Sequence, residues 1–122
     1  MLSVHSDRVG DVAVVQCEGR LVRSDSAFKL RDEVTAQDDV RVIVLDLSEV
    51  TSIEGGGLGM LLFLERWALD HDIQLKVFNP SNSVRHRLEQ AQSVMDFEIS
   101  TIQEVSTVLA QAEKHGAHIP TT

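Results

Sequence analysis

A run of three glycines, flanked by a glutamate and a leucine, is the stretch of this chain best suited by composition to hold a ligand. It lies within Glu54–Gly59, in single letters EGGGLG, and a leucine-rich segment follows it. Glycines at the start of a helix expose backbone N–H groups, and such groups bind phosphate or carboxylate. The run lacks the lysine and the serine or threonine that complete a nucleotide-binding loop. Glu54 would also repel a phosphate, so the sequence predicts weak anion affinity at most.

The other residues able to do chemistry do not form a catalytic pattern. None of the five histidines has the spacing to a second histidine and an acid that zinc enzymes show, and no serine lies in a Gly-x-Ser-x-Gly turn. Cys17 is the single cysteine, and its apolar neighbours predict an inert core thiol. Asp46 and Ser48 are expected to fix the exit of a strand through hydrogen bonds to nearby amides. We therefore expect that the protein is not an enzyme and that it has no metal site and no cofactor.

The charge balance narrows the range of partners. Eleven basic and nineteen acidic residues among 122 give a net charge of −8. This balance argues against binding to nucleic acid or to an anionic membrane surface. No apolar run reaches the roughly 18 residues of a membrane helix, and the N-terminus lacks the signal-peptide pattern. We expect one domain over residues 1–116, a flexible tail over 117–122, no membrane insertion and a cytoplasmic location.

Strand and helix patterns alternate along the chain in the order β-β-α-β-α-β-α-β-α. This order predicts an α/β sandwich with a mostly parallel central sheet flanked by helices, and an antiparallel first hairpin. The unbroken apolar run Val42–Leu45 predicts a strand that is buried on both faces. The predicted strands are Val4–Val9, Val12–Glu18, Arg41–Leu47, Ile73–Phe78 and Phe97–Ile99. The predicted helices run from Ser24 or Asp25 to Ala36, from Gly57 to Asp72, from Ser81 or Asn82 to Gln92, and from Ser100 or Thr101 to Gly116.

Helical periodicity predicts which side chains face the sheet. The expected inward residues are Ala27, Phe28, Leu30 and Val34 in the first helix, Leu58, Leu61, Leu62, Ala68 and Leu69 in the second, Val84, Leu88 and Ala91 in the third, and Ile102, Val105, Val108 and Leu109 in the last. Thr101 and Glu104 have the spacing of a capping box. Met60, Phe63 and Trp67 form a line on another side of the second helix. They pack against the neighbouring helix, or they form an exposed contact for a partner or a second copy.

The segment Val44–Gly59, VLDLSEVTSIEGGGLG, resembles the signature of STAS domains, which reads roughly LDLSxVxxIDSSGLG. STAS domains have the fold of bacterial anti-sigma-factor antagonists. The resemblance extends along nearly the whole chain, and the order of strands and helices is that of a STAS-like sandwich. Its further matching segments are Gly19–Leu21, Leu30–Arg31, Val84–Leu88 and Phe97–Ile99.

The resemblance implies a partner switch from which one residue is missing. In regulated STAS proteins, the residue before the Gly-Leu-Gly of the motif is a serine or threonine. A partner kinase, which is also the anti-sigma factor, phosphorylates it and is thereby released. That position is Gly56 here, with Gly55 and Glu54 replacing the usual serine and aspartate before it. Glycine has no hydroxyl to phosphorylate. Thr51 and Ser52 remain possible as alternative phosphate acceptors. Many STAS domains also carry an aspartate shortly after Gly-x-Leu, and the aligned position here is Val22 or Arg23.

We therefore expect a non-catalytic protein-interaction domain, with an anti-sigma factor of the serine-kinase type as its partner. A weak homodimer is left open. The alternatives are a STAS subunit of a lipid-transport ATPase, a sensory scaffold, and a domain that binds a nucleotide or small ligand at the glycines. The predicted partner-binding residues are Glu54, Gly55, Gly56, Gly57, Leu58, Gly59, Met60, Phe63 and Trp67.

Overall fold

A five-stranded sheet with strand order β1-β2-β3-β4-β5 forms the centre of the protein. The computed structural model describes residues 2–21, 24–91 and 99–117. Strands β1 and β2 pair antiparallel, and every later pair is parallel, as the sequence predicts. The strands are β1 (Leu2–Val9), β2 (Val12–Leu21), β3 (Val42–Ile53), β4 (Gln74–Phe78) and β5 (Ile99–Ser100). The helices are α1 (Ser24–Thr35), α2 (Gly56–Asp70), α3 (Asn82–Ala91) and α4 (Ile102–Ala117).

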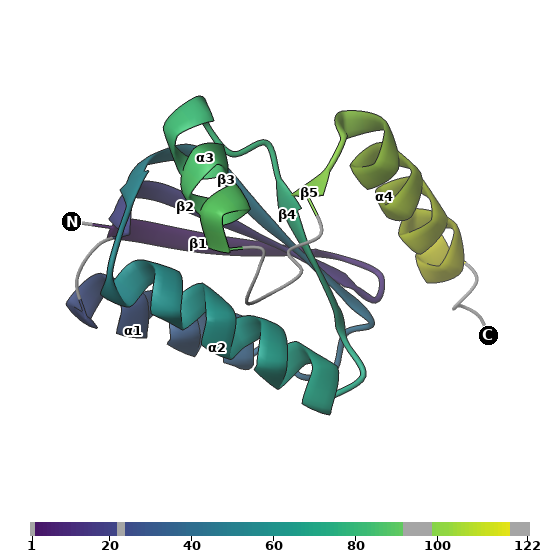
Figure 1. Cartoon of the computed structure of the whole chain (residues 1–122). Coiled ribbons are helices and arrows are strands. Elements are labelled where there is room, and N and C mark those ends of the chain that lie inside the picture. The colour runs from purple at the N-terminus through teal and green to yellow at the C-terminus, as the bar shows by residue number, and fades with distance from the viewer. Residues whose placement is uncertain (1, 22–23, 92–98, 118–122) are drawn as a thin grey trace.

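Helices cover both faces of the sheet (Figure 1). Helices α1 and α2 lie side by side under one face, and α4 crosses the opposite face. Helix α3 packs near the end of β3. Along β3 the buried side chains alternate between two clusters, because successive residues of a strand point to opposite faces. Ile43, Leu45 and Leu47 belong to the larger cluster, which includes α1 and α2, whereas Val42 and Val44 join the smaller one beneath α4. The predicted burial of this strand on both faces is confirmed.

Three strands are longer than the sequence predicts. Strand β1 begins at Leu2, where we expected Val4. Strand β2 continues past Gly19 to Leu21, and β3 continues past Leu47 to Ile53. Gly19 has a φ of 117°, and the pairing of β2 with β3 shifts register on either side of it. The glycine therefore forms an irregularity within the strand pair, where we expected it to end the strand. The predicted tie at Asp46 is present inside β3, where Oδ1 accepts hydrogen bonds from the amide and hydroxyl of Ser48 at 2.9 and 2.7 Å.

Of the predicted inward residues that the structure describes, eight are buried, four are partly buried and three are exposed. The partly buried ones are Leu58, Leu62, Val108 and Leu109. Phe28, Leu69 and Ile102 are 47%, 67% and 67% exposed, so their predicted burial is wrong. Phe28 lies one step from the buried stripe of α1, and the guanidinium of Arg31 covers its ring at 4.8 Å. Leu69 lies near the end of α2 and Ile102 at the start of α4, outside the part of each helix that packs against the sheet. Leu64, which we did not predict, is fully buried in α2. The inward residues that the structure confirms as buried are Ala27, Leu30, Val34, Leu61, Ala68, Val84, Leu88 and Val105.

Both ends of α4 lie close to the predicted positions. Thr101 and Glu104 form the predicted capping box, with hydrogen bonds of 3.0 and 3.1 Å. Helix α4 extends to Ala117, one residue beyond the expected end. The described helices include none that is both long and apolar enough to cross a membrane. Several predictions lie outside the described residues: the positions of Val22, Arg23, Gln92, Phe97, Glu98 and residues 118–122, and the burial of Ala91.

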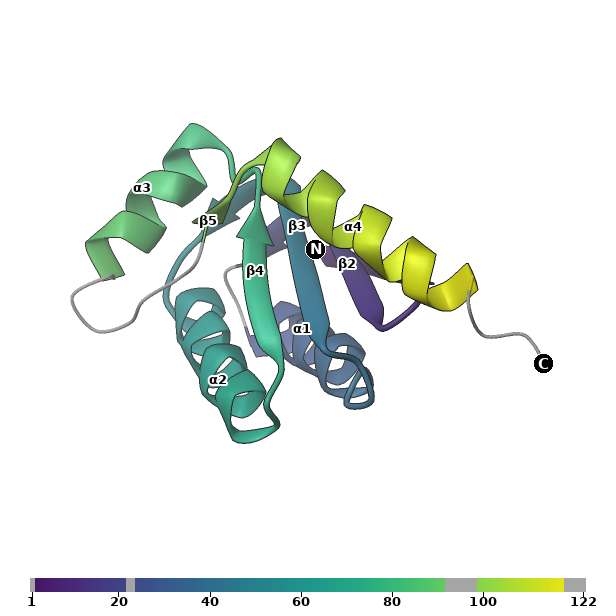
Figure 2. The ribbon, with the colours of Figure 1, turned by 90° about the vertical axis from the view of Figure 1, so that its right-hand side faces the viewer.

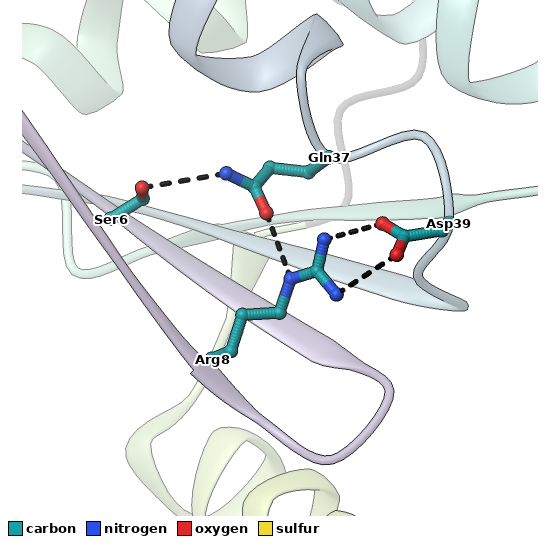
Figure 3. A network of polar contacts seen from close by, with 4 residues as sticks. All are labelled: Ser6, Arg8, Gln37 and Asp39. Carbon is teal, nitrogen blue, oxygen red and sulfur yellow. Dashed lines mark hydrogen bonds and ion pairs between the residues drawn. The ribbon is translucent and has the colours of Figure 1, made fainter.

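Polar contacts fasten the edge strand β1 to the segment between α1 and β3 (Figure 3). The Arg8 guanidinium forms an ion pair with Asp39, and its Nε donates a hydrogen bond to Oε1 of Gln37 at 2.9 Å. The Gln37 amide donates in turn to the Ser6 hydroxyl at 3.4 Å. The hydrogen bonds from Arg8 hold the pKa of Asp39 below its ordinary value. Because these groups are exposed, the contacts fix the position of β1 more than they stabilise the fold.

Cys17 on β2 is 1% exposed. Burial, aided by the negative charge of Asp46, raises the pKa of its thiol from 9.0 to about 12. A thiol with this pKa stays protonated and unreactive at neutral pH, as the sequence predicts for a core cysteine.

The stability of the protein should therefore fall in alkali. Above pH 9 the unfolded chain releases the Cys17 proton while the folded chain keeps it, so the stabilisation is complete below pH 9 and declines above it. We expect this residue alone to lower the free energy of unfolding by about 1 kcal/mol between pH 8 and pH 10. Urea unfolding followed by Trp67 fluorescence at several pH values measures the slope. The Cys17→Ala variant should lose that part of the slope, and identical slopes in the two proteins would contradict the assignment.

Candidate functional site

The glycine segment lies at the junction between β3 and α2. Strand β3 ends at Ile53 and α2 begins at Gly56, so Glu54 and Gly55 alone connect them. Gly55 has φ 46° and ψ −113°, a left-handed backbone that favours glycine. No side chain caps the N-terminus of α2. The sequence therefore correctly predicts a strand followed by a helix start here, but the strand ends at Ile53 and not at Leu47, and the helix begins at Gly56 and not at Gly57.

Gly57 is required by packing. It is buried against Leu21 at the end of β2, and a Cβ atom at this position would overlap the carbonyl oxygen of Leu21. The same carbonyl lies 3.3 Å from the backbone nitrogen of Glu54, which donates a hydrogen bond to it. The first turn of α2 thus rests directly on the backbone of β2. Gly59, by contrast, has open space around its Cβ position, so packing does not require a glycine there.

The loop does not form a phosphate cradle. The amide of Gly57 already donates to the carbonyl of Glu54 at 2.9 Å, and the amide of Glu54 is bonded to Leu21. Two of the N–H groups that a phosphate would need are therefore taken. The carboxylate of Glu54 adds negative charge beside the remaining ones. What the loop offers instead is exposed backbone at Gly55, Gly56 and Gly59, beside the exposed side chain of Glu54.

Helix α3 is tied to this loop by an ion pair that the sequence did not predict. Arg87 Nη2 lies 2.8 Å from Oε1 of Glu54, with both side chains about half exposed. Ser81, at the N-terminus of α3, accepts a weak hydrogen bond from the amide of Val84 at 3.5 Å and donates to the carbonyl of Val50 at 3.4 Å. The only sequence features that hinted at this ion pair were the acidic residue of the loop and the basic residues of α3. Their pairing depends on the tertiary fold, which no local pattern reveals.

The line of apolar residues on α2 divides into two kinds. Met60 and Trp67 are partly buried and pack against the larger core cluster, as does Leu58. The Trp67 ring also stacks on His71, with ring centres 4.6 Å apart. Phe63 is 47% exposed. Gly56, Gly59 and Phe63 share one face of α2, because residues three, four and seven apart in a helix lie above one another. Bare backbone and an exposed aromatic ring are therefore neighbours on this face.

The two hydroxyl residues before the loop are poorly placed as phosphate acceptors. The Ser52 hydroxyl is buried and has no hydrogen-bond partner within the described part of the chain. The Thr51 hydroxyl donates to the carbonyl of Gly19 at 3.2 Å, although the residue is exposed. Phosphorylation of either would require a change in the end of β3.

A comparison with known protein families gives a clear match over most of the chain. Residues 5–109 match the model of the STAS domain family. The chain belongs to the STAS domain family. The sheet with four helices is the STAS fold, as the resemblance in the sequence predicts. No curated protein matches the sequence.

Solved structures with a similar fold include anti-sigma factor antagonists and an anion transporter. The anti-sigma factor antagonist SpoIIAA of Bacillus, in its unphosphorylated form, is 16% identical over 89% of this chain and 97% of its own, with a TM-score of 0.72. An anti-sigma factor antagonist from Mycobacterium paratuberculosis is 19% identical over 90% and 95%, with a TM-score of 0.74. Murine Slc26a9, an anion transporter, is 16% identical over 86% of this STAS domain and 18% of its own chain, with a TM-score of 0.69. At these identities the likeness establishes the fold.

The two glycines of α2 should respond oppositely to alanine. Gly57→Ala forces the first turn of α2 away from Leu21, and we expect it to lower the free energy of unfolding by about 2–3 kcal/mol or more. Gly59→Ala meets no atom and improves helix propensity, so it should raise stability by about 0.5–1 kcal/mol. Urea unfolding of both variants tests this difference. Equal effects would show that the contact with Leu21 does not fix the start of α2.

Proposed function

We propose that this STAS domain is an anti-sigma-factor antagonist that binds its partner without a phosphorylation switch. Its contact surface comprises the loop Glu54–Gly59 and the adjoining side chains Met60, Phe63 and Trp67 of α2. The partner is an anti-sigma factor of the serine-kinase type, and the role places the protein in the bacterial cytoplasm. The observation that carries the proposal is the exposed, side-chain-free start of α2, with glycine at position 56.

The chemistry at Gly56 separates binding from switching. A phosphate on a hydroxyl at this position would add nearly two negative charges at the point where a partner approaches the helix. Gly56 offers no atom for that phosphate, and the hydroxyls of Thr51 and Ser52 are bonded or buried. Binding would then depend on the concentration of the antagonist, or on competition between partners. The domain acts by contact alone, since Glu54 is the single ionisable side chain of the loop and pairs with Arg87.

The exposed face of α2 supplies the features of a protein interface. Gly56 and Gly59 permit close approach by another backbone, and Phe63 provides an exposed aromatic ring on the same face. Buried aromatic residues contribute much of the energy of many protein interfaces. Met60 and Trp67 are partly covered by the domain itself, so we assign them a supporting role beneath the contact. These features also allow a second copy to bind, and a weak homodimer would compete with the partner for the same face.

A role in a transporter or a sensory scaffold is the alternative. This alternative is supported by the similarity in fold to part of Slc26a9, which is an anion transporter. Co-purification from the native cell distinguishes the two roles. Recovery of an anti-sigma kinase with its sigma factor supports our proposal, whereas recovery of a transporter ATPase supports the alternative.

Restoring a hydroxyl at position 56 should restore the switch. Gly56 is exposed at the first position of α2, so Gly56→Ser places a hydroxyl at the helix terminus. With the cognate kinase and ATP, we expect this variant to take up phosphate and to lose partner affinity by about tenfold or more. Mass spectrometry and calorimetry measure the two effects. Gly56→Ala, which adds the same Cβ without the hydroxyl, should bind the partner as the natural protein does.

The natural protein provides the decisive control in that experiment. It should show no phosphate after incubation with the kinase and should keep its affinity. Stoichiometric phosphate at Thr51 or Ser52, accompanied by loss of binding, would contradict the proposal that the switch is absent.

Two equally exposed phenylalanines allow a matched test of the contact surface. Phe63 on α2 and Phe28 on α1 are each 47% exposed. We expect Phe63→Ala to weaken binding of the anti-sigma factor by about tenfold, and Phe28→Ala to change it by less than about twofold. Calorimetry gives both affinities, and thermal unfolding confirms that the variants remain folded. A larger loss with Phe28→Ala would move the interface to α1.

A further inference from the structure

A pocket, distinct from the glycine loop, lies at the carboxyl ends of β4 and β5. Its volume is about 330 Å³. Phe78 at the end of β4, Arg85 of α3 and the junction between β5 and α4 line it. Figure 2 shows that the end of β4, the strand β5 and the starts of α3 and α4 converge here. In open α/β sheets, ligands bind in crevices outside the carboxyl ends of parallel strands.

Ser100 gives this pocket an unused polar group. The residue lines the pocket and is 4% exposed, and its hydroxyl has no hydrogen-bond partner among the described residues. Most buried polar side chains in proteins are hydrogen-bonded, because leaving one unpaired costs about 1–3 kcal/mol. A ligand in the pocket would provide the missing partner.

Arg85 gives the pocket an unused positive charge. Its guanidinium has no ion pair or hydrogen bond among the described residues. Arg85 is exposed, and it shares this lack of a partner with Arg20, whereas the other described arginines are paired with carboxylates. The paired ones are Arg8, Arg31, Arg41, Arg66 and Arg87. A planar guanidinium donates two parallel hydrogen bonds to phosphate or carboxylate oxygens.

The start of α4 adds to this positive potential. This helix has sixteen residues, and its first N–H groups carry partial positive charge. The capping box uses the amides of Thr101 and Glu104, and the amide of Ile102 has no acceptor within the described part of the chain. The Glu104 carboxylate is held on the Thr101 amide, where the hydrogen bonds from Thr101 keep its pKa low. This negative charge lies beside the start of α4 and offsets part of its attraction for an anion, so Arg85 must supply most of the positive potential.

We propose that the pocket binds a small phosphomonoester with an apolar body. The phosphate oxygens accept hydrogen bonds from Arg85, from the hydroxyl of Ser100 and from the amide of Ile102. The side chains of Phe78, Ile99 and Ile102 contact the apolar body. A phosphate is favoured over a carboxylate because its three terminal oxygens match the number of donors.

Titration with phenyl phosphate tests the proposal on the whole protein, without any partner. Amide chemical shifts in NMR spectra should move at residues lining the pocket, with a dissociation constant in the range of about 1 mM. Inorganic phosphate, which lacks the apolar body, and benzoate, which lacks the phosphate, should each bind at least about fivefold more weakly. Equal binding of benzoate, or no shifts with phenyl phosphate up to about 20 mM, would overturn the proposal.

Two variants and a matched control locate the site. Arg85→Gln and Ser100→Ala should each weaken phenyl phosphate binding by about fivefold. Arg20→Gln, which removes another arginine without a described partner, should leave binding unchanged. Because the Ser100 hydroxyl makes no hydrogen bond to the described residues, Ser100→Ala should not lower the melting temperature of the free protein. A fall in that temperature, or an equal loss of binding with Arg20→Gln, would show that these residues are structural or that the effect is one of net charge.

Discussion

The contact between Gly57 and the backbone of Leu21 is the constraint on which the interaction surface depends. Strand β2 reaches Leu21 because the sheet accommodates a register shift at Gly19. The Leu21 carbonyl then accepts a hydrogen bond from Glu54 and supports the first turn of α2. A side chain at position 57 would lift the helix from the sheet, so a glycine here is structural. With the helix start fixed in this way, Gly56, Gly59 and Phe63 are held on its outer face, beside the exposed Glu54.

Both candidate surfaces lie where parallel strands end. The contact surface follows β3, and the pocket follows β4 and β5. Helix α3 contributes to each, since Arg87 pairs with Glu54 while Arg85 lines the pocket. Two residues apart on a helix, these arginines point in nearly opposite directions. The STAS sheet thus presents two surfaces of different chemistry along one edge, one suited to a protein backbone and one to a small anion.

Local patterns in the sequence were sufficient for the elements and for the core of the sheet. The unbroken apolar run of β3 predicted burial on both faces, and the spacing of Thr101 and Glu104 predicted a cap, because both effects depend on neighbouring residues. The extension of β2 past Gly19 escaped prediction, since a glycine in a sequence indicates an end and a bulge equally well. Periodicity predicted which face of each helix is buried, but not how far along the helix the burial extends. Leu69 and Ile102 were therefore wrongly assigned to the core.

The candidate site was predictable in position and only partly in detail. The glycine run correctly marked an exposed start of α2, but nothing local distinguished Gly57, which packing requires, from Gly59, which it does not. Arg87, Arg85 and Ser100 come from other elements and meet these surfaces only in the folded chain. Such long-range neighbours have no periodic or spacing signal, so only the structure reveals the ion pair at Glu54 and the pocket beside Arg85.

The fastening of β1 has a consequence for solubility. An edge strand exposes unpaired backbone groups, and another chain can extend the sheet by pairing with them. Strand β1 is such an edge, eight residues long. Its side chains Ser6 and Arg8 are engaged by Glu33, Gln37 and Asp39, and the charged His5–Arg8 segment discourages the approach of an identical strand. The exposed face of α2 can therefore bind a partner, while the polar contacts and charges on the edge strand β1 disfavour aggregation through strand pairing.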